Sequence, residues 1–302
     1  MRLAAAPAEV TIAPGTSARG VARAVEQAGV GAPDWALFWW FRLSGDARQI
    51  KAGSYEFASG TTPRSLLDKL VRGEQALRSV TLVEGWTLRQ VREALGKAES
   101  LSPDSRAMDA AALMAALGRP GVAAEGRFFP DTYAYPKGSS DLAVLRQALV
   151  AMDRNLDAAW GQRLPSIALR TPEQALILAS IVEKETGRGE DRAQISGVFH
   201  NRLRIGMRLQ TDPTVIYGLG EGFDGNLRRS DLQADTPFNT YTRAGLPPTP
   251  IAMPGMQSLL AAVQPADTRA LYFVARGDGT SHFSPTLDEH NRAVNRYQRS
   301  TP

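Results

Sequence analysis

The stretch Thr171-Pro-Glu-Gln-Ala-Leu-Ile-Leu-Ala-Ser-Ile-Val-Glu-Lys-Glu185 decides how this chain is expected to fold. It opens with a helix-start signal: Thr171 can cap the first turn, proline is favoured at the first helical position, and Gln174 completes a capping box. Residues 175–182 are apolar almost all round, which is typical of a helix inside a core rather than on a surface. We therefore expect a buried central helix that runs into two glutamates at its carboxyl end.

Glu185 is the side chain on which the functional prediction depends. Helical spacing places it on the stripe of Leu178 and Ile181, whereas Glu183 is rotated away from that stripe. Apolar surroundings and the negative end of the helix dipole both disfavour a carboxylate, so we expect a raised pKa and a retained proton near neutral pH. A general acid requires that state. The alternative is a pair of solvated glutamates at a helix end, with Gly187 ending the helix.

The segments around this helix supply polar side chains for a cleft. A second helix is expected over 191–204, and the stretch 207–218 fits no helix or strand pattern, so we expect an irregular polar loop there. Glu125 stands in an aromatic segment with Gly and Pro, which suits either a carbohydrate-contacting loop or an aromatic-stapled turn. The alternative role for each polar loop residue is hydrogen bonding within its own loop. The predicted cleft residues, which would bind sugar or hydrogen-bond the acid, are Glu125, Gln210, Asp212, Tyr217, Asn239 and Tyr241.

The first third of the chain repeats a strand followed by a helix. Residues 10–21 align with residues 80–91, and a fainter copy begins at Ser54. Each copy has a β-branched or aromatic strand, a glycine turn and a Ser or Thr that can cap the helix. The expected caps are Ser17, Thr62 and Thr87. Because these units bring no titratable groups together, we expect this region to bind or position rather than to catalyse.

Composition excludes several kinds of site. The chain has 302 residues and no cysteine, which excludes disulfides, thiolate metal sites and thiol nucleophiles. Its histidines, His200, His282 and His290, have no metal-ligand spacing, and His200 is expected to be structural. With 35 basic and 31 acidic side chains the net charge is +4, which is weak evidence for an anionic partner. No apolar stretch reaches the roughly 18 residues that a membrane-spanning helix needs, so the chain as given is expected to be soluble.

Several long motifs stand in a fixed order and together cover nearly the whole chain. They include Glu125-Gly-Arg-Phe-Phe-Pro-Asp-Thr-Tyr133, Ala179-Ser-Ile-Val-Glu-Lys-Glu-Thr186 and Asn201-Arg-Leu-Arg-Ile-Gly-Met-Arg-Leu-Gln-Thr-Asp-Pro-Thr-Val-Ile-Tyr-Gly218. These motifs resemble those of the endolytic murein transglycosylases, the YceG-like family. The resemblance implies an α+β fold with two domains. Residues 1–118 would form an N-terminal region that includes a small LysM-like module at about 51–98. Residues 119–302 would form a catalytic domain built around the buried central helix.

The same resemblance implies a reaction. Glu185, preferred over Glu183, would protonate the bond between N-acetylmuramic acid and N-acetylglucosamine in nascent glycan strands. As a carboxylate it would then take the proton of the C6 hydroxyl while a 1,6-anhydro ring closes, with no metal or organic cofactor. A hydrolase would instead need a second carboxylate about 5–9.5 Å from the first, and Asp212 and Glu125 are the candidates.

Location and partners are also expectations from the resemblance. Family members carry an N-terminal inner-membrane helix and face the periplasm. This chain lacks that helix, so we expect a truncated soluble form. Its expected partners are peptidoglycan glycan strands and, by resemblance, penicillin-binding synthases. Two alternatives differ in class: a non-catalytic peptidoglycan-binding or scaffold protein of the cell envelope, and a nucleic-acid binder that uses Arg202, Arg204 and Arg208. No nucleic-acid motif supports the second, so no nucleic-acid partner is expected.

Overall fold

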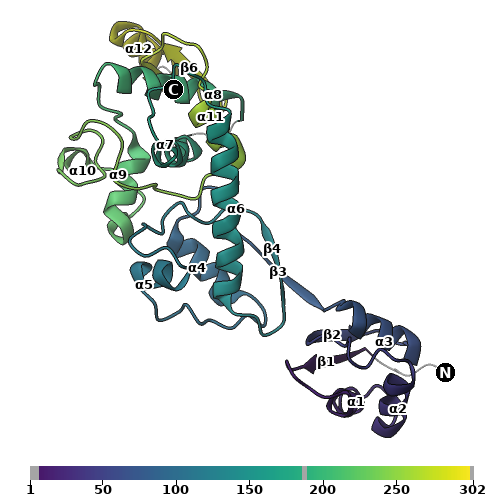
Figure 1. Cartoon of the computed structure of the whole chain (residues 1–302). Coiled ribbons are helices and arrows are strands. Elements are labelled where there is room, and N and C mark those ends of the chain that lie inside the picture. Colours follow the sequence, from purple (N-terminus) through teal and green to yellow (C-terminus); the bar gives the residue numbers. More distant parts are fainter. Residues whose placement is uncertain (1–6, 186–188, 300–302) are drawn as a thin grey trace. The chain divides into compact units, whose positions relative to one another are not determined.

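The computed structural model describes residues 7–185 and 189–299 (Figure 1). They form two compact units. The first contains the described part of Met1–Val80 with Lys97–Pro103 and Ala134–Asp141, and the second contains Thr81–Gly96, Asp104–Tyr133 and the described part of Leu142–Pro302. These bounds differ from the predicted domains 1–118 and 119–302. The range 51–98, predicted as a LysM-like module, is divided between the two units.

The first unit is a two-stranded sheet covered by helices. Strands β1 (Ala8–Ile12) and β2 (Gly53–Phe57) pair antiparallel, with Val10 opposite Tyr55. One hydrophobic core joins these strands to α1 (Ala18–Gln27), α2 (Asp34–Leu43) and α3 (Pro63–Arg72). The predicted caps Ser17 and Thr62 are confirmed, since their side chains accept N–H groups in the first turns of α1 and α3. The first two strand–helix copies therefore share a core, and the third helix belongs largely to the other unit.

The second unit is mainly helical, so the chain as a whole has mixed α+β character. Strands β3 (Leu77–Thr81) and β4 (Thr132–Pro136) pair with each other, and β5 (Tyr272–Ala275) pairs antiparallel with β6 (Ser281–Ser284). β3 and β4 each cross the division between the units. The remaining elements are α4 (Leu88–Lys97), α5 (Ala110–Ala116), α6 (Asp141–Gly161), α7 (Pro172–Glu185), α8 (Gly189–Arg204), α9 (Asp212–Leu219), η1 (Gly220–Gly222), α10 (Arg229–Gln233), α11 (Met256–Val263), α12 (Leu287–Val294) and η2 (Asn295–Arg299).

Helix α7 is the predicted central helix. The Thr171 hydroxyl accepts the N–H of Gln174 at 3.2 Å, which confirms the predicted cap. Residues 175–182 are all buried, and most of them share one hydrophobic core with side chains of α6, α8 and α11. The helix ends in the described structure at Glu185, while Gly187, its predicted terminator, lies outside the described residues. A helix buried on every side holds its last side chains in fixed positions, which suits a site built at its end.

The prediction of an irregular loop over 207–218 was wrong at its carboxyl end. Residues 212–219 form helix α9, which begins after Thr211 with a proline in its first turn. This is a helix-start signal, and the run was too short for an apolar period to reveal the helix. Thr214 and Val215 are buried, and the Thr214 hydroxyl donates to the Thr211 carbonyl at 2.8 Å. The start of α9 therefore fixes Asp212 beside the end of α7.

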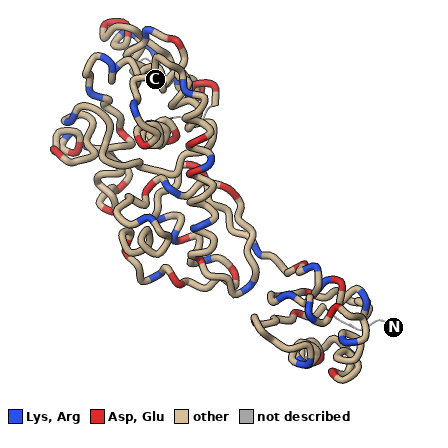
Figure 2. Tube along the Cα trace, in the orientation of Figure 1, with Lys and Arg blue, Asp and Glu red and all other residues tan. Residues whose placement is uncertain are grey.

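Charge is mixed in both units, with lysines and arginines interspersed among aspartates and glutamates (Figure 2). The arginines considered as a nucleic-acid cluster donate instead to backbone carbonyls: Arg202 to Leu271, Arg204 to Ser166 and Arg208 to Tyr241. Within 7–185 and 189–299, no helix is both long enough and apolar enough to cross a membrane.

Candidate active site

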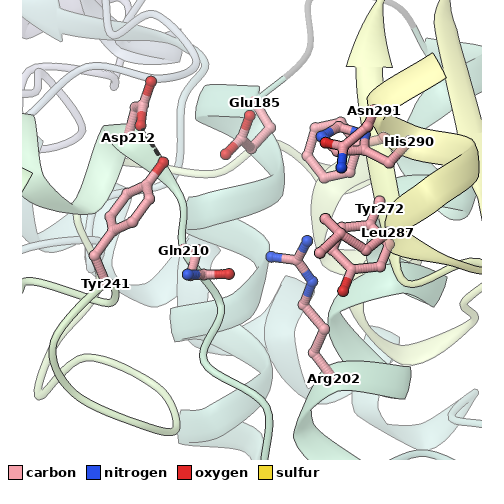
Figure 3. Close-up of a pocket in the computed structure, with 10 residues that line it drawn as sticks. Glu185, Arg202, Gln210, Asp212, Tyr241, Tyr272, Leu287, His290 and Asn291 are labelled. Carbon is pink, nitrogen blue, oxygen red and sulfur yellow. Dashed lines mark hydrogen bonds between the residues drawn. The ribbon is translucent and has the colours of Figure 1, made fainter. Parts of the chain in front are cut away.

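A cavity of about 440 Å³ lies at the carboxyl end of α7 (Figure 3). Its walls come from segments that are far apart in the sequence: the ends of α7 and α8, the start of α9, two loops, β5 and α12. All of these segments belong to the second unit. The lining residues are Glu185, Arg202, Gln210, Asp212, Tyr241, Tyr272, Phe273, Leu287, His290 and Asn291.

Glu185 is partly buried and lines this cavity as the last residue of α7. The Thr211 hydroxyl donates a hydrogen bond to its Oε1 atom. Burial raises the pKa of Glu185 to about 7, and the nearby charge of Asp212 adds to this, while the Thr211 bond and the charge of Arg202 oppose it. A large fraction of the carboxyl groups therefore carries a proton near neutral pH, and the group can donate it or take it back.

Glu183 has a different environment although it is only two residues away. Its side chain is 6% exposed, and its Oε1 lies 3.2 Å from Nη2 of Arg192 in an ion pair. Its Oε2 accepts the N–H of Gly255 at 2.9 Å, and Arg192 also donates to Gln257 at 2.8 Å. Both oxygens of Glu183 are thus bonded within the protein. The alternative of two solvated glutamates does not fit this helix end.

Three of the predicted cleft residues face Glu185 in the cavity. The Tyr241 hydroxyl donates to Oδ1 of Asp212 at 2.5 Å, and Gln210 lies below Glu185 in Figure 3. Gln210 has a left-handed backbone with φ of 48°, which is uncommon for a residue other than glycine and is often found at functional sites. Its N–H donates to the Thr240 carbonyl at 3.1 Å, which helps to hold the loop in this conformation.

Asn239 is not among the residues that line this cavity. It is fully buried, and its side-chain amide donates to three carbonyls of the preceding segment, those of Asp231, Leu232 and Ala234. Its Oδ1 accepts the N–H of Tyr241 at 2.8 Å. Asn239 therefore shapes the loop that presents Tyr241, which corresponds to the alternative role of hydrogen bonding within the loop.

The remaining two predicted residues, Glu125 and Tyr217, line a separate cavity of about 690 Å³. The Leu88 N–H at the start of α4 donates to both oxygens of Glu125, at 3.0 and 3.2 Å, and the Tyr217 hydroxyl donates to Oε2 at 3.2 Å. Burial raises the pKa of Glu125 to about 7, although these hydrogen bonds lower it. The next residue must be glycine, because Gly126 has φ of 77° and a Cβ there would lie 2.4 Å from Pro250.

Several cavity residues were not predicted. Arg202 could have been identified from the sequence, because it continues the buried stripe of α8 formed by Ile195, Val198 and Phe199. A charged side chain on such a stripe needs a partner or a function. Tyr272 lies on β5, and His290 and Asn291 lie on α12, and nothing in their sequence spacing indicated a shared site. The other two lining residues missed from sequence are Phe273 and Leu287.

His200 has the structural role that the sequence predicted. It is fully buried, its Nδ1 accepts the N–H of Ala168 at 3.0 Å, and its Nε2 lies 2.9 Å from the Ala262 carbonyl. Burial lowers its pKa to about 4, so the ring is neutral. In the part of the chain that the structure describes, no cluster of three or more His, Asp or Glu side chains could hold a metal ion.

Residues 10–296 match the YceG-like family. The chain belongs to that family. It is 30% identical to the endolytic murein transglycosylase of Bacillus subtilis (strain 168), over 95% of this chain and 84% of that protein. It is 27% identical to the endolytic murein transglycosylase of Streptococcus pneumoniae, and there it spans 57% of the relative's length. A crystal structure of a YceG-like protein from Listeria monocytogenes has a TM-score of 0.60 and 29% sequence identity, covering 95% of this chain and 98% of that one.

Proposed function

We propose that this YceG-like chain is an endolytic lytic transglycosylase that cleaves the bond between N-acetylmuramic acid and N-acetylglucosamine in peptidoglycan glycan strands. The names of its relatives from Bacillus and Streptococcus support this class of reaction. The observation that carries the proposal is the state of Glu185: a carboxyl with a pKa of about 7, held through one oxygen by Thr211, at the wall of an open polar cavity.

Glu185 would act first as an acid and then as a base. In the first step it gives its proton to the glycosidic oxygen, and the bond from that oxygen to C1 of the muramoyl unit breaks. In the second step the Glu185 carboxylate takes the proton of the C6 hydroxyl as that oxygen bonds to C1. The product is a 1,6-anhydro end, the carboxyl regains its proton, and no water is consumed. A pKa near 7 suits both steps, because neither form of the group is strongly favoured near neutral pH.

The groups around Glu185 have supporting roles in this proposal. The Thr211 hydroxyl orients the carboxyl through Oε1, which leaves Oε2 for the substrate. The charge of Asp212 favours the protonated form of Glu185. Tyr241 and Gln210 offer a hydroxyl and an amide for sugar hydroxyl groups, since polar contacts of this kind fix the orientation of a ligand.

We propose a glycan-binding role for the first unit, with its sheet and helices serving as the LysM-like module expected in the N-terminal region. The substrate class also suggests where the protein works. Peptidoglycan lies outside the inner membrane, so we propose action on the periplasmic side, beside the penicillin-binding synthases that supply nascent strands. The mixed charge of the first unit supports binding of a sugar polymer better than binding of nucleic acid, whose backbone carries a negative charge at every phosphate.

The test is the chemistry of the new ends. Uncrosslinked glycan strands are digested with the wild-type protein and with Glu185→Gln, and the products are identified by mass spectrometry. We expect 1,6-anhydro ends from the wild type and almost none from the variant. Anhydro ends produced equally well by Glu185→Gln would refute the assignment of the acid. Hydrated reducing ends would make the protein a hydrolase and would make Asp212, in the same cavity, the second carboxylate.

A further inference from the structure

The cavity around Glu185 has two chemically different sides (Figure 3). Asp212 and Tyr241 lie on one side and Glu185 lies in the middle. The other side, which we call the donor side, is formed by Arg202, His290 and Asn291. Nothing in the proposed acid–base steps uses the donor side, although it is as much a part of the cavity as the acidic side.

Arg202 is a buried cation that is fixed in place but not neutralised. Its Nε donates to the Leu271 carbonyl at 2.7 Å, its Nη1 donates to the Leu209 carbonyl, and its guanidinium lies 5.3 Å from the ring centre of Tyr272. Among the described residues no carboxylate pairs with it and none accepts a hydrogen bond from Nη2. Because a buried charge is costly without a partner, the free N–H groups at the cavity favour a ligand that brings acceptor oxygens.

His290 presents a second donor to the same space. Its ring stacks on Tyr272, with ring centres 5.2 Å apart, and its Nδ1 is buried with no hydrogen-bond partner in the described chain. Burial lowers the pKa of His290, and the charges of Arg202 and His282 lower it further, so the ring is neutral and has one N–H. A buried N–H without a partner is rarer and costlier than a buried lone pair, which places the hydrogen on Nε2.

We propose that Arg202, His290 and Asn291 bind a carbonyl or carboxylate oxygen on a ring substituent of the sugar, which makes them residues that determine the specificity of this site. This rests on the proposed function and adds the substrate chemistry that the cavity selects. Two substituents carry such an oxygen, the acetamido group and the lactyl group. A sugar whose acetamido group has been removed carries an ammonium instead, and Arg202 repels it.

The test measures binding, so that it does not depend on cleavage. In the Glu185→Gln background, the dissociation constant is measured for two probes: uncrosslinked peptidoglycan glycan strands, and chito-oligosaccharides, which have acetamido groups but no lactyl groups. His290→Phe keeps an aromatic ring against Tyr272 and removes the N–H. We expect it to weaken binding about tenfold, the value of one hydrogen bond. The matched control is His282→Phe, because that ring lies outside this cavity and contacts Tyr297.

The pattern across the two probes identifies the substituent. A loss of affinity for both probes assigns the acetamido oxygen to the donor side, and a loss for the peptidoglycan strands alone assigns the lactyl oxygen. Unchanged affinity for both probes, or an equal loss in His282→Phe, overturns the proposal. If glycan binds as expected but the wild type never cleaves it, the proposed lyase activity is refuted and the proposed role of the donor side is supported. No glycan binding in any variant refutes both.

Discussion

Two carboxyl groups in the second unit have the same raised pKa in different surroundings. Glu185 and Glu125 both have a pKa of about 7, and burial is the main cause in each. Glu125 receives protein donors on both oxygens, from the Leu88 N–H and the Tyr217 hydroxyl. Among the described residues, Glu185 receives one hydrogen bond on one oxygen, from Thr211, and it lines the cavity that also contains Arg202 and His290.

The difference shows that a raised pKa alone does not identify a catalytic acid. A carboxyl whose oxygens are both bonded within the protein must break those bonds before it can meet a substrate, and this costs free energy. Glu125 joins the start of α4 to Tyr217 on α9, and we therefore expect it to have a structural role. Within 7–185 and 189–299, Oε2 of Glu185 has no hydrogen-bond partner and the side chain lines an open cavity, and geometry is the first requirement of a general acid. Four predictions test this contrast.

The largest effect is expected on the rate of glycan cleavage. Glu185→Gln removes the proton donor, and we expect the rate to fall by about 100- to 10,000-fold. Glu125→Gln is the matched control, because it makes the same change in a buried carboxyl with the same pKa, and we expect a loss of less than about tenfold. Initial rates on uncrosslinked strands measure both. Similar losses in the two variants would contradict the distinction between the cavities.

The sequence predicts the acid better than it predicts the cavity, for a physical reason. The apolar period of α7 and the cap at Thr171 are local, so they place Glu185 at the end of a buried helix without knowledge of the rest of the fold. The donor side is made by Arg202 and His290, which are 88 positions apart, and only the packed structure brings them together. Sequence spacing carries no information about such long-range contacts.

The two cavities also differ in how far local patterns reveal them. The motif around Glu125 indicated a special loop, but the bond between Glu125 and Tyr217 joins positions 92 residues apart and depends on α9. The sequence did not reveal α9, because a helix of eight residues shows barely two turns of any period. The bounds of the two compact units likewise depend on long-range contacts, such as the pairing of β1 with β2.

The second prediction concerns Glu183, the carboxyl that is paired rather than neutral. Glu183→Ala leaves Arg192 as a buried charge without its partner, since the two side chains are only 6% and 11% exposed. We expect the free energy of unfolding to fall by about 3–5 kcal/mol, measured by urea denaturation at pH 7. Replacing both partners, as Glu183→Leu with Arg192→Met, should restore much of that loss. A Glu183→Ala protein that is as stable as the wild type but inactive would instead make Glu183 the acid.

The third prediction is a pH dependence of stability that belongs to Glu125. The ordinary pKa of a glutamate side chain is 4.5, and that of Glu125 in the folded chain is about 7. The folded protein therefore binds the carboxyl proton more tightly than the unfolded protein does. The contribution of protonated Glu125 to the stability of the fold is therefore fully present below about pH 4.5 and is lost as the pH rises through about 7. As the pH rises from 4.5 to 8, the free energy of unfolding of Glu125→Gln should increase by up to roughly 3 kcal/mol relative to that of the wild type. The contribution of Glu185 cancels in this comparison, and a difference that stays constant with pH would contradict the raised pKa.

The smallest effects separate the cavities through their tyrosines, each of which donates to a carboxylate. Tyr241 bonds to Asp212 at 2.5 Å beside Glu185, and Tyr217 bonds to Glu125 at 3.2 Å. We expect Tyr241→Phe to lower the cleavage rate about tenfold with little change in stability, because its hydroxyl is partly exposed in the open cavity and acts on substrate and on the charge beside Glu185. Tyr217→Phe should leave the rate nearly unchanged and lower the free energy of unfolding by about 1 kcal/mol, because it removes one hydrogen bond from a buried carboxyl. Both quantities are measured on both variants, the rate on glycan strands and the free energy of unfolding in urea. If the cavities have different roles, Tyr241→Phe changes mainly the rate and Tyr217→Phe changes mainly the stability. If both substitutions lower the rate and leave stability alone, Glu125 belongs to the catalytic machinery, and the larger cavity is part of the site that binds glycan.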